Sequence, residues 1–317
     1  QRNAKQLLFH SMSARPNPPP VRRPRWRRDL TVRTPRADVA MSLAAPPPPP
    51  SLDTTVEPPL AEMELVCLVD SGEAGEVWLV RHRGTRREYA LKVLYERWAA
   101  AAGGDADDDD HSSLVRCHGA TRRSGGGGEE HRIVLLEHMR GGSLSGRRVA
   151  DERALAGVAR QALSGIAHLH RRGVVHGDIR PSNLFVDSSG RVKIAGFGAD
   201  RAIDRTANGG PCRASLSPAA YMSPDHACGG GGGYAGDIWS FGLTILELYT
   251  GSFPLVEQGQ SIPLTCYSDG PPEAPATASP EFRSFVGCCL QMNPAKRPSA
   301  VQLMDHPFVT SSVFSQE

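Results

Sequence analysis

The chain has 317 residues, enough for two average domains or one large two-lobed domain, and its net charge at pH 7 is only +2. This small charge argues against a global attraction to nucleic acid or membranes, and no apolar run approaches the ~20 residues of a membrane span. Seven cysteines without a Cys-x-x-Cys pair argue against a zinc site or disulfide framework and favour a reducing compartment.

Residues 1–60 are rich in proline and arginine and include the run Pro46–Pro50. Residues 1–36 carry ten Lys and Arg against a single acid, Asp29. Without a periodic apolar pattern this segment cannot bury enough surface to offset its ordering entropy, so we expect disorder. An arginine-rich, acid-poor N-terminus is also typical of organelle transit peptides, and that alternative stays open.

A region of β-rich runs follows, separated by glycine and charged turns. The predicted strands are residues 64–69, 76–80, 88–94 and 133–137. Between the first two, Gly72 and Gly75 keep the spacing of a loop whose backbone amides approach a polyanion, although Asp70 replaces the first glycine. A simple hairpin would also need glycine there, so this motif alone is weak.

Two low-complexity insertions, residues 99–110 and 125–128, are expected to be surface loops. After Gly141 the pattern becomes helical. Residues 154–170 place six apolar side chains on one face, and residues 238–249 are apolar on most sides, which predicts a buried helix. The last helices are expected at 281–291 and 300–304. The pattern predicts an α+β fold with a small β-rich lobe and a larger helical lobe.

Two paired segments carry the chemistry: His176-Gly-Asp-Ile-Arg-Pro-Ser-Asn183 and Lys193-Ile-Ala-Gly-Phe-Gly198. The first has the order of a phosphotransfer loop, with a carboxylate and an amide five residues apart. Upstream, Lys92 lies on an apolar strand, where a lysine can reach α- and β-phosphate oxygens. The order of glycine loop, strand lysine and His-x-Asp-x-x-x-x-Asn is highly specific.

On these motifs, residues 64–309 resemble a eukaryotic protein kinase domain, which implies an N-lobe at 64–139, a C-lobe at 140–309 and a tail at 310–317. Within that superfamily the chain resembles the MAP kinase kinases, particularly the plant ones. The segments that carry this likeness are Asp178-Ile-Arg-Pro-Ser-Asn-Leu184, Ala220-Tyr-Met-Ser-Pro224, Gly236-Asp-Ile-Trp-Ser-Phe-Gly-Leu-Thr244 and Lys296-Arg-Pro-Ser299.

The resemblance implies ATP and Mg²⁺ as cofactors and assigns roles to residues. Asp178 would accept the substrate hydroxyl proton, Arg180 would steady the transferring phosphate, and Lys92 would hold the α- and β-phosphates. Asn183 would bind magnesium. Asp237, opening the buried helix, would brace the catalytic loop, and Arg297 would pair with an acid after the activation segment.

The resemblance also implies an adenine pocket at the junction of the lobes. Gly72 and Gly75 would cover the phosphates. The backbone of Glu137–Met139 would bind the adenine edge, and Leu136 would be the gatekeeper. The side chains that would enclose the base are Val77, Ala90 and Phe185.

Several departures weaken the expectation of catalysis. Gly196 stands where the family carries the magnesium-binding aspartate, and Gly177 replaces the arginine that grips an activation-segment phosphate. Between residues 198 and 221 no two Ser or Thr have the five-residue separation of the plant phosphorylation pair, and Ser217-Pro218 replaces the Gly-Thr of the substrate shelf. No clear helix supplies a glutamate to Lys92, because Glu96 lies too near it and the aspartates of 107–110 would substitute only loosely.

Ahead of the domain, Arg27-Arg-Asp-Leu-Thr-Val32 resembles the family's docking motif. Arg27 and Arg28 would meet an acidic patch on a MAP kinase, while Leu30 and Val32 would fill neighbouring pockets. Two functions remain open: a MAP kinase kinase with impaired transfer of phosphate to Ser, Thr or Tyr of a MAP kinase, or a pseudokinase scaffold or competitor. We expect a cytoplasmic or also nuclear protein, an upstream kinase as a further partner, and neither nucleic acid nor membrane.

Overall fold

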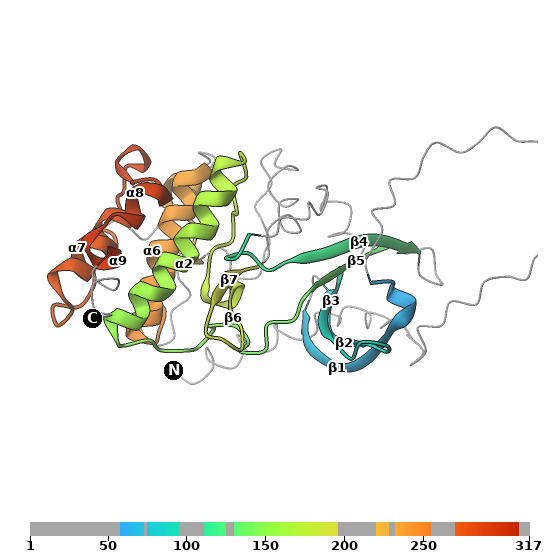
Figure 1. Ribbon diagram of the computed structural model, residues 1–317. Coiled ribbons are helices and arrows are strands. Elements are labelled where there is room, and N and C mark those ends of the chain that lie inside the picture. Colours follow the sequence, from blue (N-terminus) through green and yellow to red (C-terminus); the bar gives the residue numbers. More distant parts are fainter. Residues whose placement is uncertain are drawn as a thin grey trace, which may run out of the picture.

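The computed structural model describes residues 58–72, 75–94, 111–124, 130–195, 220–227, 232–254 and 270–310. These residues form a lobe built on a β-sheet and a larger lobe of helices, joined by the chain that leaves the last sheet strand (Figure 1). The predicted α+β, two-lobed architecture is therefore confirmed. No helix in the described ranges is long and apolar enough to cross a membrane.

The small lobe is a five-stranded antiparallel sheet in the order β1-β2-β3-β5-β4. A short 3-10 turn, η1 (Leu60–Glu62), precedes it. The strands are β1 (Met63–Gly72), β2 (Gly75–His82), β3 (Glu88–Leu94), β4 (Cys117–Ser124) and β5 (Glu130–Glu137). All four predicted strands fall on these elements. Strand β4 was not predicted, because its sequence is polar, contains a glycine and lies at the sheet edge, where little apolar surface is needed.

The sheet buries one face through alternating apolar residues, as a period-2 pattern requires. Its core contains Met63, Val80, Tyr89, Leu91, Val93, Ile133 and Leu135. Alternation along β3 leaves Ala90 and Lys92 on the opposite, half-buried face. That face therefore presents Lys92, the lysine that the sequence predicts to contact phosphate oxygens.

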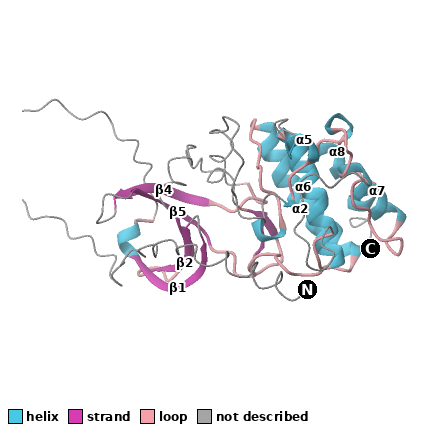
Figure 2. Cartoon of the chain, turned by 180° about the vertical axis from the view of Figure 1, so that it is seen from behind, coloured by secondary structure: helices cyan, strands magenta, loops and turns pink. Residues whose placement is uncertain are grey.

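The large lobe packs around two long helices, α2 (Glu152–Arg171) and α6 (Gly233–Thr250). Helix α2 contacts α6, α8, α9 and β7, and its buried face is the apolar face that the sequence predicted. Helix α6 is buried along most of its length, also as predicted. It lies beside α2 in both views (Figures 1 and 2). The remaining helical elements are α5 (Pro224–Ala227), α7 (Pro280–Cys289), η3 (Pro294–Lys296), α8 (Ala300–Met304) and α9 (Pro307–Thr310).

One predicted helix boundary was wrong by more than two residues. Helix α6 begins at Gly233, so Asp237 lies in its second turn rather than at its opening. Helix α7 ends at Cys289, two residues before the predicted end, with Leu290 as its C-cap. The adjacent cysteines also differ: Cys289 is buried, whereas Cys288 is half-buried, and both are unpaired thiols.

A two-stranded hairpin, β6 (Leu184–Val186) and β7 (Val192–Ile194), lies between the sheet and the helices in both views (Figures 1 and 2). Leu114 pairs with Ile194 as a parallel bridge, and the backbone nitrogen of Val115 donates to the oxygen of Ile194 at 2.8 Å. The segment that leads into β4 therefore runs alongside β7 before it joins the small sheet.

Candidate active site

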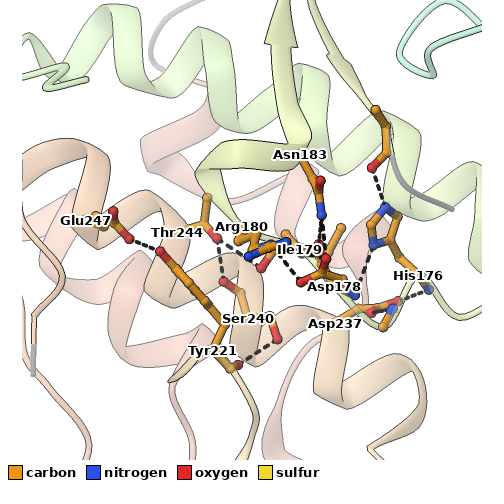
Figure 3. A network of polar contacts seen from close by, with 12 residues as sticks. His176, Asp178, Ile179, Arg180, Asn183, Tyr221, Asp237, Ser240, Thr244 and Glu247 are labelled. Atoms are coloured by element: carbon orange, nitrogen blue, oxygen red, sulfur yellow. Dashed lines mark hydrogen bonds and ion pairs between the residues drawn. The ribbon is translucent and has the colours of Figure 1, made fainter. Parts of the chain in front are cut away.

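The centre of the site is Asp178, in the loop between α2 and β6. Its carboxylate accepts hydrogen bonds from Arg180 Nε at 3.1 Å and from Asn183 Nδ2 at 2.7 Å (Figure 3). Asn183 can fold back over Asp178 because Pro181–Asn183 forms the 3-10 turn η2, which Pro181 starts at its preferred first position. The structure thus brings together three residues that the sequence singled out.

Hydrogen bonding also orients the amide of Asn183. Its Nδ2 donates both to the carboxylate and, at 2.8 Å, to the backbone oxygen of Asp178. The amide oxygen Oδ1 is therefore left as the acceptor that a cation or ligand would meet. The Asp178 side chain is only 11% exposed, so its ion pair with Arg180 is poorly screened by water.

Asp237, on helix α6, fixes the backbone of this loop by hydrogen bonds. Its carboxylate, in a residue only 2% exposed, accepts from the backbone nitrogens of His176 at 2.8 Å and Gly177 at 2.7 Å, and from His170 Nε2 at 2.8 Å. A buried carboxylate requires such donors, because without them its charge would be desolvated at a large cost. The predicted bracing contact of Asp237 is confirmed, and His170 is a partner that the sequence did not suggest.

His176 connects the loop to the strand that leads toward residue 196. Its Nδ1 accepts from the backbone nitrogen of Asp178 at 3.2 Å, so Nε2 carries the proton and donates to the backbone oxygen of Ala195 at 3.0 Å. The nitrogen of Ala195 in turn donates to the oxygen of Asn183 at 2.9 Å. Ala195 is therefore hydrogen-bonded to the first and the last residue of the segment 176–183.

The residues predicted for an adenine pocket lie on β2, β3 and β6 and in the linker that follows β5. Val77 pairs with Lys92 between β2 and β3, and Ala90 pairs with Leu136 between β3 and β5. Across the junction, Phe185 lies on β6 and bridges to Ser143 in the chain that follows Met139. Met139 itself is buried. The apolar residues assigned to the two sides of an adenine base thus come from opposite lobes, with the linker at 138–142 joining them.

Gly72 and Gly75 face each other at the end of the β1–β2 pair. The backbone of Gly75 has a φ of +151°, and a Cβ there would lie 1.8 Å from the backbone oxygen of Val93. Glycine at 75 is therefore required by the close approach of β2 and β3. This local reason is independent of any ligand, as the weaker interpretation of the motif anticipated.

Lys92 is half-buried on β3, and no carboxylate within the described ranges forms an ion pair with it. A different lysine makes the polar contact between lobes: Lys193 Nζ lies 2.7 Å from Glu137 Oε2. Lys193 had no expected role from the sequence. Its one available signal was a lysine between Val192 and Ile194 in an otherwise buried strand, a position that requires a partner.

A second polar layer supports the loop from helix α6 (Figure 3). Thr244 Oγ1 donates to the backbone oxygen of Ile179 at 3.3 Å, and Ser240 Oγ donates to that of Tyr221 at 2.8 Å. The Tyr221 hydroxyl donates to Glu247. Burial raises the pKa of Tyr221, and it also raises the pKa of Glu247 although the tyrosine hydrogen bond opposes this.

Arg297 forms the structural ion pair that the resemblance implied. Its Nη2 lies 2.5 Å from Asp225 Oδ1, and its remaining nitrogens donate to the backbone oxygens of Ala235 and Gln291 at 3.0 and 2.8 Å. The guanidinium also stacks over Trp239, 5.0 Å from the ring centroid. Asp225, one methylene shorter than the family's glutamate, is long enough to make this contact.

Several predicted features lie outside the described residues. They are Gly196 and the segment to residue 219, Glu96, the aspartates of 107–110, and the docking residues Arg27, Arg28, Leu30 and Val32.

Comparison with known proteins supports the resemblance over most of the chain. Residues 64–309 match the protein kinase domain family. The chain is 34% identical over 260 residues to mitogen-activated protein kinase kinase 8 of Arabidopsis thaliana, covering 79% of this chain and 83% of that protein. It is 34% identical over 273 residues to mitogen-activated protein kinase kinase 1c of Physcomitrium patens, covering 79% and 77%.

A higher identity is found over a shorter region. Mitogen-activated protein kinase kinase 7 of Arabidopsis thaliana is 45% identical over 191 residues, which cover 57% of this chain and 61% of that protein. Kinase kinase 9 of the same plant is 44% identical over 188 residues. The chain thus spans about three fifths of the length of these two relatives.

Proposed function

This chain belongs to the protein kinase domain family, among the mitogen-activated protein kinase kinases, and we propose that it binds ATP but transfers phosphate to a MAP kinase weakly or not at all. The observation that carries the proposal is an ordered Asp178–Asn183 pair immediately beside Ala195, whose neighbour in the sequence is Gly196. In this proposal Asp178, held by Arg180 and Asn183, accepts the proton, while Gly196 offers no carboxylate to a metal.

The residues available to magnesium do not match what that ion prefers. Mg²⁺ is usually held by one or two carboxylates together with substrate phosphates. Of the two positions that correspond to metal ligands, Asn183 offers an amide oxygen and Gly196 offers no side-chain oxygen. Metal neutralisation of a transferring phosphate supplies several kcal/mol, and each ~1.4 kcal/mol is tenfold in rate. We therefore expect turnover several orders of magnitude below that of a fully equipped kinase.

Nucleotide binding does not require the same metal ligand. Lys92 on β3 has no ion-pair partner among the described residues and is available to the phosphates, while Val77, Ala90 and Phe185 offer apolar surface for a base. A thermal-shift titration with ATP, with and without Mg²⁺, measures this directly. Stabilisation by ATP that magnesium changes little supports the proposal. No stabilisation under either condition contradicts nucleotide binding.

Phosphotransfer is tested with the natural chain beside its Gly196→Asp variant, using a MAP kinase as the substrate. A Gly196→Asp, Asp178→Asn double variant is the control, because it restores the metal ligand but removes the proton acceptor. Transfer that appears only in the single variant supports the proposal. Robust transfer by the natural chain would refute impaired catalysis.

We also propose that residues 27–32 bind a MAP kinase, so that the chain acts as a scaffold or competitor where transfer is lost. The support is the pattern of the segment: Arg27 and Arg28 followed by the alternating apolar residues Leu30 and Val32. Changing these four residues to alanine should abolish MAP kinase binding in a pull-down with purified proteins. Unchanged affinity would eliminate the motif.

A cytoplasmic or nuclear location completes this proposal. A fluorescent fusion at the C-terminus of the chain tests it, and import into an organelle would instead assign the arginine-rich residues 1–36 to a transit peptide.

A further inference from the structure

One ion pair ties the large lobe to the end of the small sheet. Lys193 on β7 and Glu137, the last residue of β5, are 56 positions apart in the sequence, and Nζ lies 2.7 Å from Oε2. Lys193 is only 9% exposed and lies between two buried residues of its strand. A lysine so buried needs an anionic partner, and Glu137 supplies it from the other lobe.

Glu137 is in turn fixed within the small lobe. Its backbone nitrogen donates to the oxygen of Arg116 at 2.9 Å, and its carboxylate accepts from the nitrogen of Arg116 at 3.3 Å. It also pairs with Tyr89 of β3. The residue that follows it starts the linker between the lobes. Whatever holds the Glu137 carboxylate therefore holds the first peptide groups of that linker.

The other end of the ion pair lies beside the pocket floor. Lys193 and Phe185 are direct cross-strand partners in the β6–β7 hairpin, so their side chains project from the same face. Phe185 is the large-lobe residue assigned to the adenine base. Lys193 thus joins the floor of the pocket to the linker that would bind the edge of the base.

From this geometry we infer that Lys193 is a positioning residue for the adenine ring. It holds the peptide groups of Glu137–Met139 at a set height above Phe185 through the Glu137 carboxylate. The inference rests on the proposed binding of nucleotide. It assigns a purine-recognition role to a residue that touches neither the phosphates nor the catalytic carboxylate.

The role separates Lys193 from Lys92 in a binding measurement. Replacement of Lys193 by methionine keeps the aliphatic stem and removes the charge. Lys193→Met should weaken adenosine and ATP by the same factor, about tenfold, which corresponds to ~1.4 kcal/mol. Lys92→Met, a change at a phosphate-binding position, should weaken ATP while leaving adenosine unchanged. Dissociation constants for both ligands are measured by titration calorimetry on the full chain.

Three further variants complete the experiment. Lys193→Arg should restore most of the adenosine affinity, and Glu137→Gln should reproduce the loss from the other side of the pair. Glu64→Gln is the matched control, since it breaks an exposed ion pair with Arg86 of similar length, 2.9 Å, away from the linker. Circular dichroism shows which variants are folded, and Glu137→Gln decides the question where Lys193→Met does not fold.

Hydrogen exchange at the amides of residues 137–142 in the ligand-free chain supplies a readout independent of nucleotide. Faster exchange there in Lys193→Met, but not in Glu64→Gln, supports the hold of Lys193 on the linker. If the natural chain binds neither ligand, the nucleotide proposal fails and the adenine role fails with it, whereas the hold on the linker is still decided by the exchange rates. Unchanged adenosine affinity in a folded Lys193→Met chain that binds adenosine would overturn the inference. Unchanged linker exchange would overturn it as well.

Discussion

Removal of the Asp237 carboxylate should be among the most damaging single changes in the large lobe. The side chain lies in α6, in a residue 2% exposed, and accepts hydrogen bonds from three donors at 2.7–2.8 Å. Two donors are backbone nitrogens of the catalytic loop, and the third is His170. Replacement by alanine removes the acceptor from all three donors, of which the His176 nitrogen is buried and the other two are part-buried.

The magnitude follows from those contacts. A buried donor left without an acceptor costs about 1–3 kcal/mol. The three together give roughly 3–6 kcal/mol, because two of them are only part-buried and losses within one network do not add fully. A domain of this kind is stable by only about 5–15 kcal/mol. Asp237→Asn keeps one oxygen for the two donors that share Oδ2 but turns an NH₂ group toward the Gly177 nitrogen, so we expect a loss of about 2 kcal/mol.

Urea unfolding followed by far-ultraviolet circular dichroism measures these losses, because most of the helix is in the large lobe. The control is Asp151→Ala, which removes the exposed N-cap of α2 and should cost about 1 kcal/mol. The expected order of stability is natural chain, Asn variant, Ala variant. A loss below that of the Asp151 control in Asp237→Ala would refute the reasoning.

Three other predictions follow from local geometry. Gly75→Ala places a Cβ 1.8 Å from a β3 backbone oxygen and should lower stability by at least about 2 kcal/mol in thermal unfolding. Gly157→Ala, in open space on α2, should instead raise stability by up to ~1 kcal/mol. Equal effects of the two changes would contradict this. Burial raises the pKa of Asp187, but hydrogen bonds from the following turn outweigh it and hold the pKa below the ordinary 3.8. This carboxylate therefore stabilises the fold above that pH, and the stability gap between the natural chain and Asp187→Asn should shrink as pH falls below about 4 in urea titrations; a pH-independent gap would be inconsistent. In Arg297→Lys the ammonium group cannot reproduce the guanidinium hydrogen bonds to Asp225 and two backbone oxygens, so the variant should lose about 2–4 kcal/mol of stability in urea unfolding. No measurable loss would show that only the charge of residue 297 matters.

The motifs of the sequence predicted the two-lobed fold and the residues at the centre of the site. Asp178, Arg180 and Asn183 were found because they are close in sequence and a single turn, η2, brings them together. Residues that lie within five positions of one another can be predicted to meet without knowledge of the rest of the fold. The long apolar helices were equally predictable, since their burial follows from periodicity alone.

What the sequence did not reveal depends on pairing between distant segments. The Lys193–Glu137 contact spans 56 positions and two lobes, and neither residue type is unusual by itself. His170 was treated as part of an amphipathic helix, because its acceptor, Asp237, is 67 positions away. The start of α6 was misplaced for a related reason, because the glycines of its first turn are tolerated where the lobe's packing holds the backbone.

The contacts of Asp237 suggest how this catalytic loop tolerates change. The carboxylate binds the peptide nitrogens of residues 176 and 177, not the side chain of residue 177. Gly177 has a φ of +79° and open space where a Cβ would project, so glycine relaxes a conformation that other residues adopt at a cost. The conformation of the loop is therefore fixed by hydrogen bonds to its backbone. A regulatory side chain at residue 177 can be lost without a change in that conformation. A partner that recognises the outline of this loop would not distinguish a silent relative from an active one.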